Sequence, residues 1–462
     1  MAIGDIIVGI DIGTSKVSTF VGEVNNFNQI EIICNTSTKC SAIQKGVIVN
    51  EDELSSAISK TIKEAEDISN FKINSVYTVI PGKYVTIVQN SIVKDAKDKF
   101  AGITIKDVSS AIIQVREIEI PEDKVLIDIV PDKFILDDGK AIDDPVGKFS
   151  SNFTLTAQII LADKEYVKQL KNVFKNAGIE IDGVVPISLA ERNLVLDTNE
   201  LQDNVMILDI GAGNTEIGVF NGSSFIYTNT IPLGGDNITS DIAYVLNISR
   251  EEADKLKRQY GLALRSFIDN DNNIVLNTYK DVDTKNVTIK SSDLIEIIEA
   301  RIEEIFTLIN KDITLKGLKN NINNVILTGE GIVNINKSDM AGKIILNIPV
   351  KISTGRLVST VKSLGSFRKI LSVISSPCTP DCKILYFFLN ITNETNPIKP
   401  STINITGIEI CTVDFFRRIA NSIPNPMPAN NNTNKKEKET FINSLFFSFF
   451  SCDLIFTTFG ID

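Results

Sequence analysis

Two aspartate-led glycine turns, one in each half of the chain, constrain its fold more than any other sequence feature. The first turn (DIGTSK, residues 11–16) follows the short apolar run 6–10, and the second (DIGAGNT, residues 209–215) follows the apolar run 205–210. A short apolar run that ends at a glycine turn is typical of a buried strand. The two strand–turn units predict two similar halves, each presenting one turn to a ligand held between them.

A third glycine turn (TGEG, residues 328–331) follows another apolar run, 325–328. Glycine lets the backbone bend sharply and bring its N–H groups against a ligand, and such a nest of N–H groups suits phosphate. A single turn of this kind is more often the tip of a hairpin with no ligand. The repetition favours a phosphate site instead, with the third turn facing the base and sugar of a nucleotide.

The aspartates that open the first two turns, Asp11 and Asp209, suggest a metal ion beside the phosphates. Mg²⁺ on a nucleotide is usually held through one or two carboxylates, waters and phosphate oxygens. We therefore predict that these two carboxylates meet across one cleft and hold Mg²⁺ through water.

The chain up to Gly365 alternates between strand and helix patterns, which predicts an α/β fold with helices packed on sheets. Helical spacing of apolar residues predicts helices at 53–68, 166–177, 250–260 and 293–311. Apolar and β-branched runs predict strands at 6–10, 76–80, 84–88, 125–129, 133–136, 154–161, 205–210, 216–220 and 325–328.

Composition excludes several functional classes. The chain has no histidine, which excludes serine–histidine hydrolases and zinc or iron sites built on histidine. Its formal net charge of −11 argues against nucleic acid as a partner. There is no CxxC pair, and the opening MAIGDIIVGIDIG lacks the basic segment and long apolar core of a secretory signal, so we expect a cytoplasmic location.

These motifs resemble those of the actin-like ATPase superfamily and, within it, the FtsA family of bacterial cell-division proteins, over residues 6–365. IIVGIDIGTSKV is similar to the first phosphate motif, VMILDIGAGNTEIGVF to the second, and VILTGEGIVNI to the adenosine motif. IPLGGDNITSDIA is similar to the segment that opens the second nucleotide-facing subdomain of FtsA. The resemblance implies an α/β, actin-like (RNase H-like) two-lobed fold that binds ATP with Mg²⁺.

The resemblance also implies the roles of individual residues. They are Asp11, Gly13, Thr14, Ser15 and Lys16 in the first loop, Asp209, Gly211, Gly213, Asn214 and Thr215 in the second, and Gly234, Gly235, Gly329 and Gly331 on the nucleoside side. EEADKLKRQYG is similar to the ribose-facing helix, which makes Asp254 and Lys257 further candidates. A surface i,i+3 salt bridge explains that pair equally well.

An inserted subdomain distinguishes FtsA from sugar kinases, chaperones and MreB-like filaments. Residues 84–163 resemble this insert, most specifically at Asp144-Pro145-Val146-Gly147. We therefore expect 1–83 with 164–203 as the first large subdomain, 204–235 with 323–365 as the second, and 236–322 as the smaller second subdomain. The pilus-assembly ATPase PilM shares much of this layout and stays an alternative, as does a small-molecule kinase of the same fold.

Nucleotide binding is better supported than hydrolysis, which needs a group that orients a water in line with the γ-phosphate. In MreB-like relatives a Glu or Gln is expected to do this, and the matching position here holds Val185. Glu191 lies close by, but on a helical segment where we expect an ordinary exposed role. We assign no catalytic residue and expect tight Mg-ATP binding with weak or negligible turnover.

By resemblance, the chain would be an ATP-binding cell-division scaffold. It would self-associate into protofilaments through the insert and bind the C-terminal tail of the tubulin-like protein FtsZ on 236–322. A membrane-binding C-terminal helix would then tether FtsZ to the inner face of the cytoplasmic membrane at the division site.

Two departures from the family pattern matter. Glu330 stands where FtsA relatives usually have a third glycine, so it adds bulk and charge where the adenine approaches.

After Gly365 the chain changes character: this segment holds 12 of the 24 Phe but only 2 of the 26 Gly, and it does not resemble the helix that completes the second large subdomain. We hypothesise a change of reading frame, or of the gene's end, near Gly365, which makes 366–434 a divergent region and linker.

Residues 435–462 would form the membrane helix. As a helix, one apolar face gathers Phe441, Ile442, Leu445, Phe446, Phe449 and Phe450. An interfacial helix is one interpretation, although its polar face has little positive charge, and a hydrophobic end that aggregates is the other. Asp453 and several hydroxyl groups interrupt the stretch, which argues against a transmembrane span.

Overall fold

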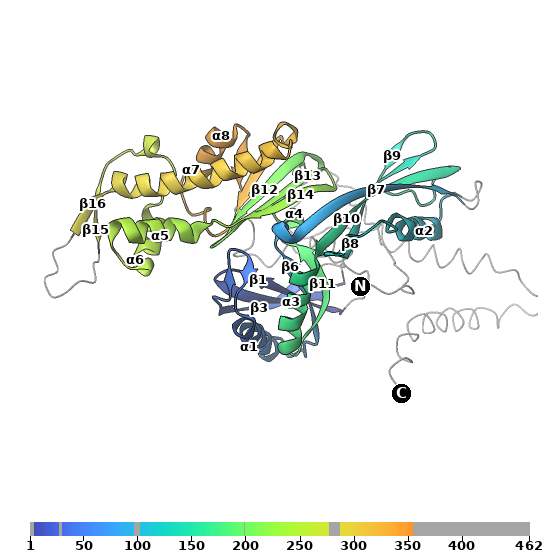
Figure 1. The fold of residues 1–462 in the computed structure, drawn as a ribbon, viewed down its shortest axis with the longest axis horizontal. Coiled ribbons are helices and arrows are strands. Elements are labelled where there is room, and N and C mark those ends of the chain that lie inside the picture. Colours follow the sequence, from blue (N-terminus) through green and yellow to red (C-terminus); the bar gives the residue numbers. More distant parts are fainter. Residues whose placement is uncertain (1–3, 27–29, 97–101, 198, 277–286, 354–462) are drawn as a thin grey trace, which may run out of the picture. The chain divides into compact units, whose positions relative to one another are not determined.

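The computed structural model describes residues 4–26, 30–96, 102–197, 199–276 and 287–353 (Figure 1). The expected linker at 366–434, the expected amphipathic helix at 435–462 and the end of the second large subdomain at 354–365 lie outside the described residues. Of the described helices, none is long and apolar enough to cross a membrane.

The first glycine turn belongs to a five-stranded sheet in the order β11-β6-β1-β2-β3. Its strands are β1 (Ile6–Ile12), β2 (Lys16–Val24), β3 (Ile30–Lys39), β6 (Ser75–Ile80) and β11 (Glu180–Pro186). β1, β2 and β3 are antiparallel neighbours, whereas β6 and β11 run parallel to β1 on its other side. Helices α1 (Glu51–Ser69) and α3 (Lys164–Asn176) bury apolar faces in the core of this sheet.

The second glycine turn belongs to another five-stranded sheet, in the order β14-β13-β12-β17-β18. Its strands are β12 (Asn204–Ile210), β13 (Thr215–Asn221), β14 (Ser224–Ile231), β17 (Asn324–Thr328) and β18 (Val350–Ile352). Three strands are again antiparallel, and β17 and β18 run parallel to β12 on the other side. Since strand order and strand directions match those of the first sheet, the prediction of two similar halves is confirmed.

Helices cover both faces of the second sheet. Met206, Leu208 and Ile210 of β12 share one core with helices α5 (Gly235–Leu246), α7 (Ser291–Leu315) and α8 (Ser338–Leu346). The alternate residues Val205 and Ile207 pack with helix α4 (Ile187–Val195) on the opposite face. Burial on both faces explains why the strand is an almost continuous apolar run in the sequence.

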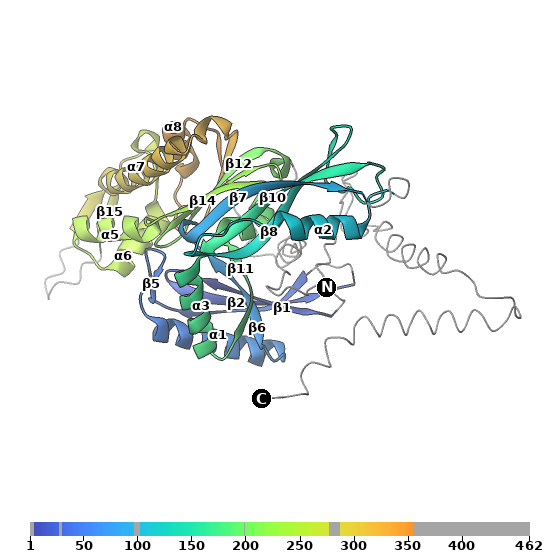
Figure 2. The same cartoon turned by 45° about the vertical axis from the view of Figure 1, so that its right-hand side comes forward.

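Between β6 and α3 the chain forms a separate sheet in the order β7-β10-β8-β9, with helix α2 packed on it (Figure 2). Its elements are β7 (Val85–Asp95), α2 (Ile105–Val115), β8 (Lys124–Leu136), β9 (Ala141–Ile142) and β10 (Asn152–Asp163). The two strands predicted at 125–129 and 133–136 are in fact the single strand β8. Pro131 cannot donate to the ladder, and a register shift opposite β10 leaves Asp132 as a bulge instead of ending the strand.

The remaining elements are short except for α6. They are β4 (Ile43–Gln44), β5 (Val47–Ile48), α6 (Arg250–Tyr260), β15 (Asn273–Leu276), β16 (Val287–Lys290) and 3-10 turns at Gly82–Tyr84, Glu200–Gln202, Arg265–Phe267 and Lys319–Asn321. Helix α6 has the predicted ends, and the ends of α1, α3 and α7 lie close to those predicted.

One carboxyl group is buried in the inserted sheet with a single hydrogen bond. Asp128 on β8 is 4% exposed; its Oδ1 accepts from the Ile129 N–H at 2.7 Å, and its Oδ2 has no partner among the described residues. Burial raises the pKa of Asp128 from 3.8 to about 8. The protonated form is therefore the one that the fold accommodates.

We predict that Asp128→Asn stabilises the protein increasingly as the pH rises. The carboxyl contributes stability that is fully present below its unfolded pKa of 3.8 and is lost as the pH rises through its folded pKa of about 8. An amide does not ionise, so the free energy of unfolding should exceed that of the wild type by about 1–3 kcal/mol near pH 8 and by less near pH 5. Urea titrations at both pH values measure this, with the exposed Asp138→Asn as control. A gain that does not change with pH would contradict the prediction.

Candidate functional site

The two glycine turns have the same backbone geometry. In the first, the Gly13 N–H donates to the Lys16 carbonyl at 2.9 Å, and in the second, the Gly211 N–H donates to the Asn214 carbonyl at 2.9 Å. Each bond closes the loop of an antiparallel hairpin, between β1 and β2 or between β12 and β13. The similarity of the two sequences is therefore a similarity of structure.

The tips of the two turns touch. A Cβ atom on Gly213 would lie 2.6 Å from Thr14 Cγ2, which is closer than carbon atoms approach, so only glycine fits where the second loop meets the first. The contact brings the predicted residues of both loops to one place, although the loops are far apart in sequence.

The nucleoside-side glycines pack against the second turn. The Gly235 N–H donates to the Gly211 carbonyl and the Gly331 N–H to the Ile210 carbonyl, both at 2.9 Å. A Cβ on Gly331 would lie 2.2 Å from the Gly211 oxygen. Gly234 and Gly329 approach atoms of the second turn as closely. Close backbone packing thus explains these glycines and holds the third turn and the start of α5 beside the second glycine turn.

Two predicted loop residues are used within the protein. Thr215 is fully buried, and its hydroxyl donates to the Leu233 carbonyl at 2.8 Å. The Ser15 carbonyl accepts from the Cys40 N–H at 3.1 Å, whereas the residue itself is exposed. Thr215 therefore supports its loop, and Ser15 is accessible to a ligand.

Four carboxyl groups converge behind the turns. Asp11 is surrounded by protein yet keeps solvent access, as expected for a residue that lines an open cleft. Desolvation and the Asp209 carboxylate raise its pKa to about 6, against the opposing effect of Lys16. Burial also raises the pKa of Asp209. Glu191 and Glu216 complete the group.

The expectation that Glu191 has an ordinary exposed role was wrong. Its Oε2 is fully buried, and burial, together with the charge of Asp209, raises its pKa well above the ordinary value. Asp209 lies next to the Glu191 side chain, and this neighbour favours the protonated form of Glu191. The partner lies on β12 rather than on α4, so no local sequence pattern could show the contact.

Glu216 is a further buried carboxyl group that no motif singled out. It lies on β13 directly opposite Asp209 and is 5% exposed. It accepts hydrogen bonds from the Gly82 N–H and from the Thr230 hydroxyl, both at 2.9 Å. Burial raises its pKa to about 8, and these hydrogen bonds oppose the rise.

Glu330 points at the first turn. Its Oε1 lies 3.2 Å from Lys16 Nζ, and the two side chains are 65% and 42% exposed. This ion pair links the third turn to the first across the cleft. Glu330 thus competes for the lysine that the first loop would offer to phosphate.

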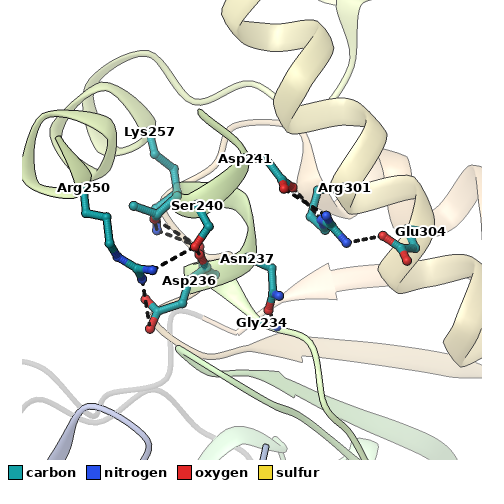
Figure 3. A network of polar contacts seen from close by, with 11 residues as sticks. Gly234, Asp236, Asn237, Ser240, Asp241, Arg250, Lys257, Arg301 and Glu304 are labelled. Carbon is teal, nitrogen blue, oxygen red and sulfur yellow. Dashed lines mark hydrogen bonds and ion pairs between the residues drawn. The ribbon is translucent and has the colours of Figure 1, made fainter. Parts of the chain in front are cut away.

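Lys257 and Asp254 form the i,i+3 ion pair, at 3.0 Å, that was the alternative to a ribose site. The lysine is nevertheless only 6% exposed, and its ammonium donates to the Gly235 carbonyl at 3.1 Å and the Thr239 hydroxyl at 2.7 Å (Figure 3). Asp254 is shared with Arg258, at 2.7 Å. Lys257 therefore fixes the start of α5 next to the second turn.

The residues present fit a magnesium–nucleotide complex. A cation near Asp11 and Asp209 would relieve the cost of keeping two acidic groups in protein-rich surroundings. The Asn214 Oδ1 is buried and has no hydrogen-bond partner in the described part of the chain. Among the described residues, no three acidic or thiol side chains are placed to coordinate one metal ion directly. Mg²⁺ on a nucleotide keeps several waters, and Asp11 and Asp209 would hold it through them.

Two family models match the chain. One, described as "Cell division protein FtsA", matches residues 206–423, and the other, "SHS2 domain inserted in FTSA", matches residues 82–161. The matches confirm the predicted fold class, an actin-like α/β fold with an FtsA-type insert. The first match extends beyond Gly365, and the divergence proposed there stays a prediction.

Curated relatives are similar over most of their length. The cell division protein FtsA of Borreliella burgdorferi is 31% identical over 329 residues, 71% of this chain and 79% of its own. FtsA of Bacillus subtilis is 30% identical over 325 residues, 70% and 73% of the two chains. Among solved structures, the PilM–PilN type IV pilus biogenesis complex has a TM-score of 0.48 at 15% identity, over 75% of this chain and 87% of that chain. ADP-bound MreB5 of Spiroplasma citri has a TM-score of 0.47 at 14% identity, over 79% and 97%.

We predict that Glu330→Gln tightens Mg-ATP binding by roughly three- to tenfold. Removing the charge beside Lys16 frees that lysine for phosphate, and it also removes a repulsion of about 1 kcal/mol between the Glu330 carboxylate and the phosphates. Isothermal titration with ATP and Mg²⁺ measures the change. Glu165→Gln is the matched control, since Glu165 is an exposed glutamate that pairs with Lys168 at 3.7 Å. Unchanged or weaker ATP binding in Glu330→Gln would contradict the prediction.

Proposed function

Because this chain belongs to the FtsA family of cell-division proteins, we propose that it is an ATP-binding scaffold that forms protofilaments and tethers FtsZ to the inner face of the cytoplasmic membrane. The observation that best supports the proposal is the contact of the two phosphate turns, Thr14 against Gly213, in a chain whose insert also matches the family.

ATP would act as a clamp between two sheets. The first turn belongs to the sheet of β1 and the second to that of β12, so a ligand bound by both turns holds the sheets together. Asp11 and Asp209 would hold Mg²⁺ through water, and Lys16 would balance phosphate charge. A ligand favours the state that binds it best, so ATP should favour the closed, assembly-competent state.

Turnover would be weak because no described carboxylate is free to orient a water at the position used by MreB-like relatives. Val185 is 3% exposed and packs with Ile7, Val24 and Ile30. The side chain of Glu191 lies against Asp209, and its raised pKa favours the protonated form. Binding without rapid hydrolysis suits a scaffold that is switched by nucleotide occupancy.

The FtsZ tail would bind in a groove of about 560 Å³ between α5 and α7, within the smaller second subdomain. Its apolar lining includes Tyr244, Val245 and Ile297. Tyr244 is 88% exposed and Val245 60% exposed, and such uncovered apolar side chains beside a groove are typical of a recognition surface.

Charges surround this groove. The guanidinium of Arg301 binds both oxygens of Asp241, at 2.6 and 2.9 Å, and also contacts Glu304, so it connects α5 to α7 (Figure 3). Asp293 and Glu296 add further negative charge to the lining. A net acidic rim around an apolar floor suits a short peptide with apolar anchors and a basic side chain.

The insert and the C-terminal segment would supply the polymer and membrane contacts. Apolar side chains stand exposed on the insert at Val93 (67%), Ile113 (52%) and Phe149 (72%), which suits contact with a neighbouring copy. The membrane contact is proposed from the sequence of residues 435–462, which lie outside the described residues.

We predict that Tyr244→Ala weakens binding of an FtsZ C-terminal peptide by roughly 10–30-fold, as expected for loss of a central aromatic anchor. Fluorescence anisotropy of the labelled peptide measures the affinity. Phe149→Ala removes another exposed aromatic ring, outside the groove, and should leave peptide binding unchanged. Absence of binding by the wild type would argue against the FtsZ role, and equal binding by both variants would argue against this groove.

A further inference from the structure

The inserted subdomain begins at a lysine whose ammonium lies near the second glycine turn. Lys83 lies in the single turn Gly82–Tyr84 between β6 of the first sheet and β7 of the insert. The family match for the insert starts at residue 82. Lys83 therefore lies at the junction between the first sheet and the insert.

The backbone of this junction is fixed to the second sheet. The Gly82 N–H donates to Glu216 Oε2 at 2.9 Å, and the Lys83 N–H donates to the Thr230 hydroxyl oxygen at 3.0 Å. Thr230 in turn donates to Glu216. A Cβ atom on Gly82 would lie 2.2 Å from Thr228 Oγ1, so the chain runs directly against β14.

The side chain of Lys83 extends away from β14, towards the turn between β4 and β5 and towards Asn214 of the second glycine turn. Its Nζ donates to the Lys45 carbonyl at 2.6 Å. A Cβ atom on the adjacent Gly46 would lie 3.2 Å from Lys83 Nζ and 3.4 Å from Asn214 Nδ2, so the ammonium and the loop amide both lie close to that glycine. Among the described residues, no carboxylate forms a salt bridge with Lys83.

Charge makes this arrangement suited to an anion. The one carboxylate with a marked electrostatic effect on the ammonium, Glu216, is already bonded to Gly82 and Thr230. Lys16, the cation of the first loop, is paired with Glu330 of the third turn instead. Two cations, Lys16 and Lys83, therefore lie near the two glycine turns. Lys16 is paired with Glu330, whereas no described carboxylate lies within salt-bridge distance of Lys83.

We propose that Lys83 binds the terminal phosphate of ATP and thereby couples the presence of that phosphate to the root of the insert. The inference rests on the proposed ATP binding and adds to it a residue that distinguishes ATP from ADP. The Gly82 N–H is hydrogen-bonded to Glu216 of β13 and the Lys83 N–H to Thr230 of β14. With the Lys83 side chain on the phosphate, the phosphate and the start of the insert share one short connection.

The test compares ATP with ADP in the full-length chain. The Lys83→Met substitution keeps the apolar part of the side chain and removes the charge. Affinity for the non-hydrolysable analogue AMP-PNP with Mg²⁺ should then fall roughly tenfold, as expected for the loss of one charge-assisted hydrogen bond. Affinity for ADP should stay within about twofold of the wild-type value. Lys83→Arg should retain most of the discrimination. Lys133→Met, at an exposed lysine of the insert, is the control for the charge change, and thermal unfolding checks the fold of each variant.

Hydrogen exchange provides a second readout. Adding AMP-PNP should slow amide exchange over residues 82–88 in the wild type, and ADP or the Lys83→Met substitution should abolish this effect. Equal losses of ATP and ADP affinity, or no loss, in Lys83→Met would overturn the inference while leaving ATP binding intact. A wild type that binds neither nucleotide would instead overturn the proposed function, and this inference with it.

Discussion

The arrangement of the cleft depends on how the protein accommodates four carboxyl groups where two sheets meet. Each group loses hydration, which disfavours its charged form, and each is compensated differently. Glu216 accepts hydrogen bonds from a backbone N–H and a hydroxyl, the raised pKa of Glu191 favours its protonated form, and Asp11 lies near Lys16. Asp11 and Asp209 are left with the least internal compensation, so a hydrated cation is the natural partner of these two groups.

The glycines around the cleft have a structural cause that is compatible with ligand binding. Gly213 allows the second loop to touch Thr14, and Gly331 allows the third turn to lie against the Gly211 carbonyl. Larger residues at either place would push apart the loops whose N–H groups would face phosphate. Packing and binding therefore demand the same residue, and the glycine pattern alone cannot separate the two.

Local sequence was enough to predict what is determined locally. The apolar runs before Asp11 and Asp209 identified both hairpins, and apolar spacing identified α6 with its correct ends. It failed where a residue's role depends on a partner distant in the chain. Glu191 looked like a surface residue because its neighbour Asp209 is on β12. Nothing in the motif around Glu216 or in the sequence around Lys83 indicated their contacts with residues distant in the chain, and the two strands expected at 125–129 and 133–136 are one strand with a bulge.

The junction at Gly82 shows how nucleotide occupancy can affect a distant surface without a long chain of contacts. β6 belongs to the first sheet, and β7 of the insert begins directly after Tyr84. Between them, the Gly82 and Lys83 N–H groups donate hydrogen bonds to side chains of the second sheet. A Cβ atom on Gly82 would lie 2.2 Å from Thr228 Oγ1, so this junction packs directly against β14 and a change in the angle between the two sheets would disturb it. Glu216, which anchors the junction, is also the residue paired with Asp209 across the β12–β13 hairpin. The proposed phosphate site and the start of the insert are thus separated by the width of a single strand pair.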